Sequence, residues 1–201
     1  MSKKTKIIEN FSDPLKLFEK WFKDAIKSEA TDPNAMNLAT ISKNFKPSSR
    51  IVLLKNFDKR GFVFYTNLKS RKGISILTNS SVALNFYWKS LFRQVRIEGR
   101  AKVVNNKEAD AYFRSRPRDS KISAWASKQS SKLKSRKELQ DKFDFYKKKF
   151  KNEEIPRPYS WKGFRVNPTT IEFWQKKPFR LHDRVEYKKK GKLWSRIRLY
   201  P

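Results

Sequence analysis

The sequence predicts an α+β, mainly β fold: an antiparallel β-barrel with surrounding helices. Many short runs of β-branched and aromatic residues are separated by turn residues, and a few amphipathic helices are interleaved among them. The 37% hydrophobic and 14% aromatic content of the 201 residues supports a packed core. We expect one domain over residues 13–201, preceded by a mobile basic arm at 1–12.

The first half of the chain alternates helices and strands. Asp13 followed by Pro14 indicates a helix start, and apolar residues from Leu17 to Ile26 recur at helical spacing. Gly61 closes a turn between two apolar runs, which indicates a hairpin. In order, we expect a helix from 13, strands at 36–42, 51–54 and 62–65 with the hairpin turn at 58–61, a helix at 70–77, and strands at 82–88 and 91–104.

The second half begins with two helices. Asn106 is expected to cap a helix that ends between Arg114 and Ser120. Ser135 and Glu138 form a capping box, and the charged helix that follows has an apolar stripe ending at Phe150. After the break at 156–158, we expect four strands, at 161–166, 169–175, 180–187 and 193–199.

The composition excludes several kinds of site. There is no cysteine and only one histidine, which argues against disulfides, thiol catalysis and metal centres, so we predict no metal. No apolar run approaches the ~18 residues of a membrane span, and residues 1–10 lack the apolar region of a signal peptide. The sequence therefore predicts a cytoplasmic protein without a membrane partner.

The charge balance is strongly basic, with 49 Lys and Arg against 19 Asp and Glu, a net charge of +30. Such an excess is typical of proteins that bind nucleic acid or anionic lipid. The basic residues are spread over every segment, however, and no RNP motif, zinc finger or leucine zipper is present. We therefore do not expect nucleic acid as a partner.

Anion binding by side chains is the chemistry that the motifs favour. The five glycines cannot form a GxGxxG or P-loop motif. One basic cluster combines Arg116, Arg118 and Ser120 with Tyr112, and a second combines Arg50, Arg71, Lys72 and Ser130. Ser70 is expected to cap the helix that begins at Arg71, where free backbone N–H groups also favour an anion. Taken alone, the hairpin stretch favours the alternative that these cations are solvated side chains at the edges of a buried hairpin.

Two further sets of residues on strands are candidates for a site. Arg180, His182 and Arg184 alternate along one predicted strand, close to Trp174, and are expected to share a face. Arginine stacks on flat electron-poor rings and histidine hydrogen-bonds ring substituents. Gln94 is the second candidate, and its side chain is either a polar contact inside a pocket or part of an exposed strand face. A solvated strand face is also an alternative interpretation of Arg180, His182 and Arg184.

The ordered motifs resemble those of the pyridoxamine 5′-phosphate oxidase family. They are RIVLLK (50–55), FYTN (64–67), SRK (70–72), RQV (93–95), YFxSRPRDS (112–120), AWxSxQSS (124–131), GFRV (163–166), IEFWQ (171–175), RLHDR (180–184) and the RLxP ending at 198–201. The resemblance runs from about Asp13 to Pro201. It implies an FMN-binding split barrel and a homodimer with FMN at the interface, in which 157–201 serves dimerisation and the active site.

The resemblance also implies an activity. The family oxidises pyridoxamine or pyridoxine 5′-phosphate to pyridoxal 5′-phosphate, a step of pyridoxal phosphate biosynthesis and salvage. Oxygen accepts the electrons and hydrogen peroxide is released. The catalytic residues implied are Arg180 and His182.

By motif, the implied FMN contacts are Arg50, Ile51, Val52, Leu53, Leu54, Lys55, Tyr65, Thr66, Arg71, Lys72, Gln94, Gln129, Ser130, Trp174 and Arg184. The implied substrate contacts are Lys55, Tyr112, Arg116, Ser120, Arg180, Leu181 and His182. One departure concerns the N-terminal arm, where family members often carry an Arg-x-x-Tyr element that closes over the substrate. Residues 1–12 contain neither arginine nor tyrosine.

Two alternative functions follow from the same sequence. The first is a polyanion- or nucleic-acid-binding protein on a flavin-type barrel, which would use the excess positive charge and bind more weakly at high salt. The second is a split-barrel flavoprotein with another substrate, in which the motifs at 116–120 and 180–182 would have other roles.

Overall fold

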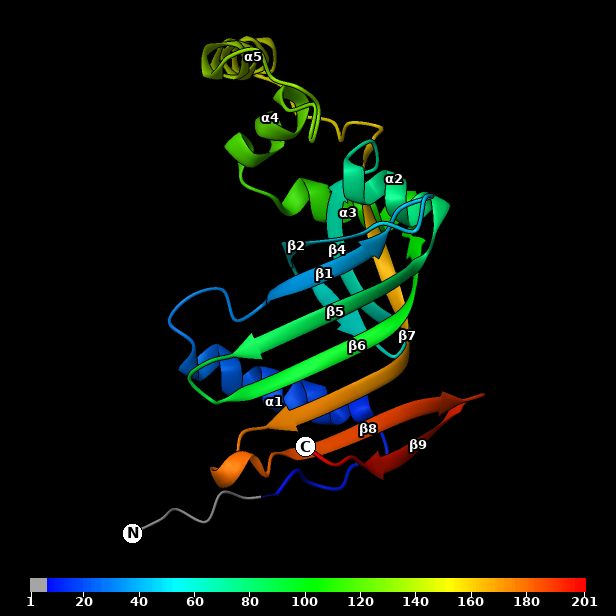
Figure 1. Cartoon of the computed structure of the whole chain (residues 1–201). Helices are drawn as coiled ribbons and strands as arrows, with labels where there is room; N and C mark the ends of the chain where they lie inside the picture. Colours follow the sequence, from blue (N-terminus) through cyan, green and yellow to red (C-terminus); the bar gives the residue numbers. More distant parts are fainter. Residues whose placement is uncertain (1–6) are drawn as a thin grey trace.

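A computed structural model describes residues 7–201 of the chain (Figure 1). Its helices are α1 (Pro14–Ser28), α2 (Arg71–Thr78), α3 (Asn106–Ser115), α4 (Arg118–Ala126) and α5 (Arg136–Lys149), with a 3-10 turn η1 (Pro178–Arg180). Its strands are β1 (Ala35–Ile41), β2 (Pro47–Leu53), β3 (Asn56–Asp58), β4 (Gly61–Asn67), β5 (Ser81–Trp88), β6 (Arg93–Val103), β7 (Trp161–Gln175), β8 (Asp183–Lys190) and β9 (Leu193–Arg198).

The strands form one curled antiparallel sheet, which confirms the predicted architecture. Its order is β2-β1-β5-β6-β7-β4-β3, and β8 pairs with both β7 and β9. Figure 1 shows α1 packed on the lower strands and α2 to α5 gathered at the opposite end. The strand β7 pairs with β6, β4 and β8, and so connects these two ends.

The main core lies between the concave face of the sheet and α1. Alternate residues of β5, from Val82 to Trp88, are buried there, as the period of two in a strand requires. On α1, the side chains of Leu17, Phe18 and Trp21 are buried as predicted. Ile26, which was expected on the same apolar face, is exposed.

A second, smaller core holds α3, α4 and α5 together beside the end of β7. It contains Phe113, Ile122, Phe150, Ile155 and Trp161. Phe150 is buried, whereas the rest of the predicted stripe on α5 is only partly buried or peripheral. The guanidinium of Arg118 donates to the backbone carbonyls of Phe150 and Glu153 near the end of α5. Arg118 therefore joins α4 to α5 and is not part of an anion cluster.

The predicted hairpin of strands 51–54 and 62–65 is wrong in its pairing. The turn closed by Gly61 joins β4 to the short strand β3, whereas β2 pairs with β1. The chain crosses between the two pairings at residues 54 and 55. The Leu54 N–H donates to the Asn34 carbonyl at 2.8 Å, and the Lys55 N–H donates to the Val63 carbonyl at 2.8 Å.

The two strands predicted at 161–166 and 169–175 form the single strand β7. Pro168 cannot donate a ladder hydrogen bond, but it lies where the pairing with β6 shifts register, between Glu98 and Gly99. A Cβ on Gly99 would lie 2.2 Å from the Asn167 carbonyl oxygen. The glycine therefore permits the close approach that lets β7 continue through the proline.

The strand predicted from Arg180 begins three residues later, at Asp183. Arg180 ends the 3-10 turn, and both Phe179 and Arg180 have positive φ angles, of 56° and 60°. The predicted alternation of Arg180, His182 and Arg184 on one strand face is therefore wrong, because the chain turns before the strand starts.

The part of the predicted N-terminal arm that the structure describes is packed against strand β8. Ile8 is buried, and its backbone N–H donates to the Asp183 carboxylate at 2.5 Å. The Tyr187 hydroxyl donates to the Phe11 carbonyl at 2.8 Å. Residues 7–12 are thus fixed against β8, and the rest of the predicted arm, 1–6, lies outside the described residues.

Candidate active site

A cavity of about 410 Å³ opens between β2, β4, α3, α4 and the loop after α4. Many residues that the family motifs implicate line it. They are Ile51, Val52, Leu53, Lys55, Tyr65, Thr66, Lys72, Tyr112, Arg116 and Gln129. The remaining lining residues include Trp161, which the sequence did not single out.

The cations at this cavity have no carboxylate partners among residues 7–201. Lys55, Lys72 and Arg116 line it, and Arg50 and Arg71 lie close enough to interact electrostatically with each other. None of the five forms one of the ion pairs that the structure contains, although arginines elsewhere, such as those at 157 and 165, do. This concentration of uncompensated positive charge suits an anionic ligand.

One corner of the cavity joins β4, α2 and the loop after α4. The Thr66 hydroxyl donates to the Gln129 side-chain oxygen at 2.9 Å, and Lys72 Nζ lies 3.3 Å from the same oxygen. Burial, and then the nearby Arg50, lowers the pKa of Lys72. Ser70 caps α2 by accepting from the Gly73 N–H at 3.2 Å, as predicted. The corner therefore presents a desolvated ammonium beside a helix N-terminus.

Arg50 is held beside this corner by strand β1. Its guanidinium donates to the Leu38 carbonyl at 3.1 Å, the Thr40 hydroxyl at 2.8 Å and the Ser48 hydroxyl at 2.6 Å. Burial, and then the charge of Arg71, lowers the pKa of Arg50. Arg50 does not line the cavity, whereas Lys55 does, so the two cations serve different places.

Three stacked aromatic rings form the wall of the cavity. The rings of Tyr65 and Tyr112 lie 4.1 Å apart at 16°, and those of Tyr65 and Trp161 lie 5.1 Å apart at 8°. Gly163 pairs with Tyr65 across β4 and β7, and a Cβ there would lie 2.8 Å from the Tyr65 ring. Burial, and then the charge of Glu108, raises the pKa of Tyr65 to about 12.

Arg116 lies over this wall, directly after α3. Its guanidinium carbon is 4.8 Å from the centre of the Trp161 ring and 5.6 Å from that of Phe113. Its Nη1 is buried and has no hydrogen-bond partner among the described residues, and burial lowers its pKa. Ser120 lies in the first turn of α4, outside the residues that line the cavity.

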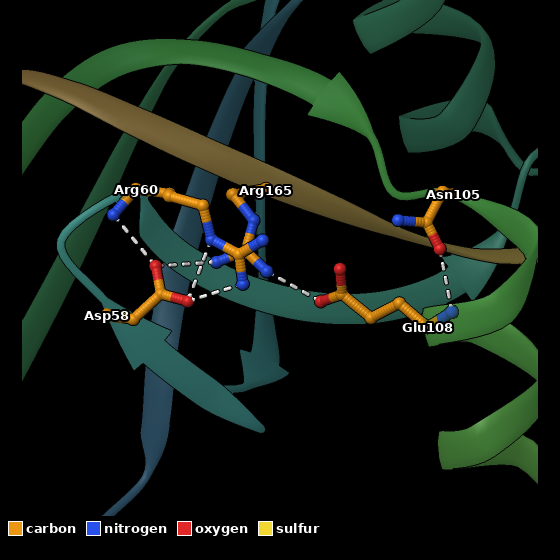
Figure 2. A network of polar contacts seen from close by, with 5 residues as sticks. All are labelled: Asp58, Arg60, Asn105, Glu108 and Arg165. Carbon is orange, nitrogen blue, oxygen red and sulfur yellow. Dashed lines mark hydrogen bonds and ion pairs between the residues drawn. The ribbon is translucent and has the colours of Figure 1, made fainter.

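An ionic network fixes α3, which carries Tyr112 and precedes Arg116 (Figure 2). Arg165 of β7 donates to Asp58 at 3.0 Å and to Glu108 at 2.6 Å. Asn105 caps the helix by accepting from the Glu108 N–H at 2.8 Å, so the prediction of Asn106 as the cap is wrong by one residue. Asp58 also receives hydrogen bonds from Arg60. Burial alone would raise the pKa of Asp58, but these bonds lower it.

A second group of predicted residues lies on the outer face of the sheet. Gln94, Trp174 and Arg184 are direct cross-strand neighbours on β6, β7 and β8. On each strand one adjacent residue is buried in the core, namely Val95, Phe173 and Val185. The buried carboxylate of Glu172 accepts from Arg184 Nε at 2.8 Å and from Arg96 Nη1 at 3.0 Å. The hydrogen bond from Arg184 to Glu172 raises the pKa of Arg184.

His182 and its neighbours extend this second group. The imidazole lies 4.7 Å from the Trp174 ring, and its Nδ1 accepts from the Lys177 backbone N–H at 3.2 Å. Arg180 and Leu181 are exposed. Figure 1 shows this turn at the end of the molecule opposite α3 and α4. None of the second group lines the cavity, so a single chain does not bring the two groups together.

Four of the predicted FMN contacts neither line the cavity nor belong to the second group, and they are Arg50, Leu54, Arg71 and Ser130. Arg50 and Arg71 interact electrostatically with each other beside the cavity. Leu54 is buried in the main core, and its backbone N–H and carbonyl are both hydrogen-bonded to Asn34. Ser130 follows Gln129 in the loop after α4, with an exposed side chain and a φ of 71°.

The sequence matches two family models. Residues 22–149 match the family described as "Pyridoxamine 5′-phosphate oxidase", and residues 161–201 match its "C-terminal dimerisation region". The chain belongs to the pyridoxamine 5′-phosphate oxidase family. As a member of this family, it is an FMN-dependent oxidoreductase with FMN as its cofactor.

Curated relatives of the chain are named pyridoxine/pyridoxamine 5′-phosphate oxidase. The one from Agrobacterium fabrum is 50% identical over 192 residues, which cover 94% of this chain and 93% of the relative. The one from Sinorhizobium fredii is 52% identical with the same coverage. Family membership thus rests on nearly the full length of both proteins.

Solved structures confirm the split-barrel fold of this oxidase family. PhzG from Burkholderia lata, in complex with tetrahydrophenazine-1-carboxylic acid, superposes with a TM-score of 0.90 at 29% identity, covering 96% of this chain and 95% of that one. A pyridoxamine 5′-phosphate oxidase-related, FMN-binding protein from Nostoc punctiforme has a TM-score of 0.73 at 14% identity, covering 92% and 97%.

The dimerisation region of the family covers β7, β8 and β9, which supports a homodimer. It includes Trp174, His182 and Arg184 of the second group. Among residues 7–201, no helix combines the length and the apolar character needed to cross a bilayer.

Proposed function

We propose that this protein oxidises pyridoxamine 5′-phosphate or pyridoxine 5′-phosphate to pyridoxal 5′-phosphate, with oxygen as electron acceptor and hydrogen peroxide as product. The observation that carries this proposal is the set of unpaired cations at the cavity. They form two clusters, and the reaction brings together two phosphorylated molecules, the cofactor and the substrate.

The cluster of cations at the start of α2 suits the phosphate of FMN. Arg50, Arg71 and Lys72 gather where Ser70 caps α2, and charge-assisted hydrogen bonds from such groups are the usual means of holding a phosphate without a glycine-rich loop. The lowered pKa of Lys72 supports this assignment, because an anion there would offset both the burial of the ammonium and the repulsion from Arg50. Bound FMN supplies the two-electron redox chemistry.

The cluster that contains Lys55 and Arg116 suits the phosphate of the substrate. Lys55 and Arg116 are the lining cations that do not belong to α2, and Tyr112 lines the same cavity as part of the aromatic wall. The unpartnered Nη1 of Arg116 is a buried donor that a phosphate oxygen would satisfy. We include Ser120 in this group, one turn away along α4.

The second group, on the outer face of the sheet, completes the site in a homodimer. We propose that Gln94, Trp174 and Arg184 of one subunit contact the FMN held at the cavity of the other. Arg180 and His182 of the same segment then orient the pyridine ring of the substrate over the flavin. The separation of the two groups within one chain supports this arrangement, because each alone is half of a site.

Closure over the substrate differs from the pattern common in the family. Residues 1–12 have no Arg-x-x-Tyr element, and residues 7–12 are packed against β8. We propose that this part of the arm serves as a fixed support for the turn that carries Arg180 and His182.

The decisive experiment is anaerobic mixing of the FMN-loaded protein with pyridoxamine 5′-phosphate while the visible absorbance of the flavin is followed. We expect bleaching, and then recovery of colour with release of peroxide when air is admitted. In Arg180→Ala, bleaching is expected to be slow at saturating substrate, and near-normal bleaching would remove Arg180 from its role.

Two other outcomes would redirect the assignment. A yellow protein that pyridoxamine and pyridoxine phosphates do not bleach would keep the fold and the cofactor but would overturn the substrate. A chain that takes up no FMN and instead binds nucleic acid in a steeply salt-dependent manner would favour the polyanion-binding alternative.

A further inference from the structure

We infer that Trp161 is a positioning residue for the phosphate of the substrate, because its ring holds the guanidinium of Arg116 at the cavity. This inference rests on the proposed function and adds a residue to it. Trp161 lies at the first position of β7, and no family motif in the sequence drew attention to it.

The contact is between a partly buried cation and the face of an aromatic ring. The guanidinium carbon of Arg116 lies 4.8 Å from the centre of the Trp161 ring, within the range of cation–π attraction, and Trp is the strongest such partner. Arg116 has no carboxylate partner in the described chain, and its Nη1 has no hydrogen bond. The ring face therefore replaces part of the solvation that burial removes.

Trp161 is held both at its backbone and at its ring. Its backbone N–H donates to the Pro158 carbonyl at 2.9 Å, and its carbonyl accepts from Arg157 at 2.8 Å. The Arg157 side chain is mostly buried and pairs with Asp110 of α3 at 2.6 Å. The Trp161 ring is stacked with the Tyr65 ring of β4 at an interplanar angle of 8°. A residue held in this way from β4 and α3 can define the position of the cation above its ring.

Pre-organisation is the functional consequence. An arginine that has to be desolvated and ordered when the ligand arrives loses affinity to those costs, whereas Arg116 meets them on folding. Because the face of a ring accepts none of the hydrogen bonds of the guanidinium, the N–H donors remain available to the oxygens of a phosphate. Trp161 thus acts on the substrate only through Arg116.

The test is a double-mutant cycle on the FMN-loaded protein with Trp161→Leu, Arg116→Gln and the double variant. Anaerobic flavin reduction gives the apparent Kd and the limiting rate for pyridoxamine 5′-phosphate and for pyridoxamine, which lacks the phosphate. Trp161→Phe retains a weaker ring face. Trp125→Phe is the matched control, because Trp125 packs in the same cluster against Tyr146 and Phe150 but not against Arg116.

We expect Trp161→Leu to raise the apparent Kd for pyridoxamine 5′-phosphate by roughly 3- to 30-fold, with the limiting rate and the values for pyridoxamine nearly unchanged. Trp161→Phe should fall between wild type and Trp161→Leu, and Trp125→Phe should match wild type. In the Arg116→Gln background, the effect of Trp161→Leu should disappear. Equal losses for both substrates, or additive effects in the cycle, would show a merely structural role and overturn the inference.

Binding of inorganic phosphate, measured by calorimetry on the same holoproteins, separates this inference from the proposed function. If pyridoxamine 5′-phosphate fails to bleach the wild-type flavin, the proposed substrate is wrong. The inference is then supported if Trp161→Leu weakens phosphate binding only when Arg116 is present. It is overturned if phosphate affinity does not depend on Trp161, or if the wild type binds no phosphate.

Discussion

At the scale of single residues, the partners of an arginine differ between structural positions and the cavity. Arg157 and Arg165, which hold elements together, are paired with carboxylates, whereas Arg118 joins α4 to α5 through backbone carbonyls. Arg50, beside the cavity, and Arg116, which lines it, are bound by neutral groups or aromatic rings. Pairing with a carboxylate neutralises a cation, whereas a carbonyl or a ring face fixes it and leaves its charge available.

Tyr65 should titrate far from an ordinary tyrosine. Burial raises its folded-state pKa to about 12 from the ordinary tyrosine value of 10.0, so the folded state retains the phenol proton between these two pH values. The resulting stabilisation is complete below pH 10 and is lost as the pH rises through 12. We expect phenolate absorbance to show one late step, which Tyr65→Phe removes. A late step that persists in Tyr65→Phe would assign it to another tyrosine.

Gly163→Ala should damage the aromatic wall. The added Cβ would lie 2.8 Å from the Tyr65 ring, which Tyr112 and Trp161 hold in place, so the ring or the strand has to move. We expect urea unfolding to show a loss of about 1–3 kcal/mol. In a Tyr65→Leu background the loss should shrink, and an equal loss there would mean that the backbone of β7 causes it.

The sequence identified most side chains that line the cavity, because short motifs carry them, but it missed Trp161 and misplaced Arg180. The importance of Trp161 depends on an arginine more than forty positions away in the chain, and no local pattern signals that contact. Arg180 was placed on a strand because alternation of polar residues indicates a strand. Phe179 and Arg180 have positive φ angles in this turn, and because neither residue is glycine, the sequence gives no signal of the turn.

At the scale of elements, α3 depends on a tether from β7. Arg165 is mostly buried and links Asp58 and Glu108, so it holds the helix that carries Tyr112 against the sheet. Arg165→Met would leave two partly buried carboxylates without this partner. We expect a loss of about 1–3 kcal/mol in urea unfolding, discounted from a fully buried pair because the carboxylates are partly exposed.

The control for Arg165→Met is Lys137→Met on α5. Lys137 pairs with Asp141 on an exposed helix face, where such pairs contribute about 0.5 kcal/mol or less. If the two substitutions cost the same, the Arg165 network has no special structural role.

Glu172 should fix Arg184 of the second group on the outer face, as Arg165 fixes α3. It bridges Arg96 and Arg184 from a buried position, so Glu172→Gln leaves Arg184 with a neutral and weaker partner. We expect the apoprotein to bind FMN about tenfold more weakly, and the potential of the bound flavin to rise because a negative charge is lost nearby. Glu98→Gln, which removes only an exposed partner of Arg96, is the control. Unchanged FMN affinity in Glu172→Gln would separate Arg184 from the cofactor.

The elements themselves were largely predictable, and their pairing was less so. Caps at Asp13, Ser70 and Ser135 and the apolar run of the strand predicted at 82–88 are local signals, and the structure confirms the caps and the strand. The partner of β2 and the continuity of β7 depend on residues distant in sequence. Pro168 predicts a break between two strands. The chain nevertheless continues as the single strand β7, because the register shift at Gly99 accommodates the proline.

At the scale of the whole molecule, a shared site predicts that two inactive variants restore each other. Arg116→Gln damages the cavity and Arg180→Ala damages the outer-face turn. In a mixed dimer, one site would carry both changes and the other neither. Random mixing should then recover about a quarter of wild-type activity. The variants assayed separately provide the baseline, and no recovery on mixing would place both groups of one chain in the same site.

The central position of β7 has a consequence for the synthesis of the chain. Its residues 161–175 lie late in the sequence, yet they fill the space between β6 and β4 in the sheet. Until they leave the ribosome, both neighbours present unpaired edges, and a nascent chain with open edges is prone to aggregate. Premature termination before residue 161 would therefore leave a fragment with an incomplete sheet, and such fragments should be substrates for chaperones and proteases.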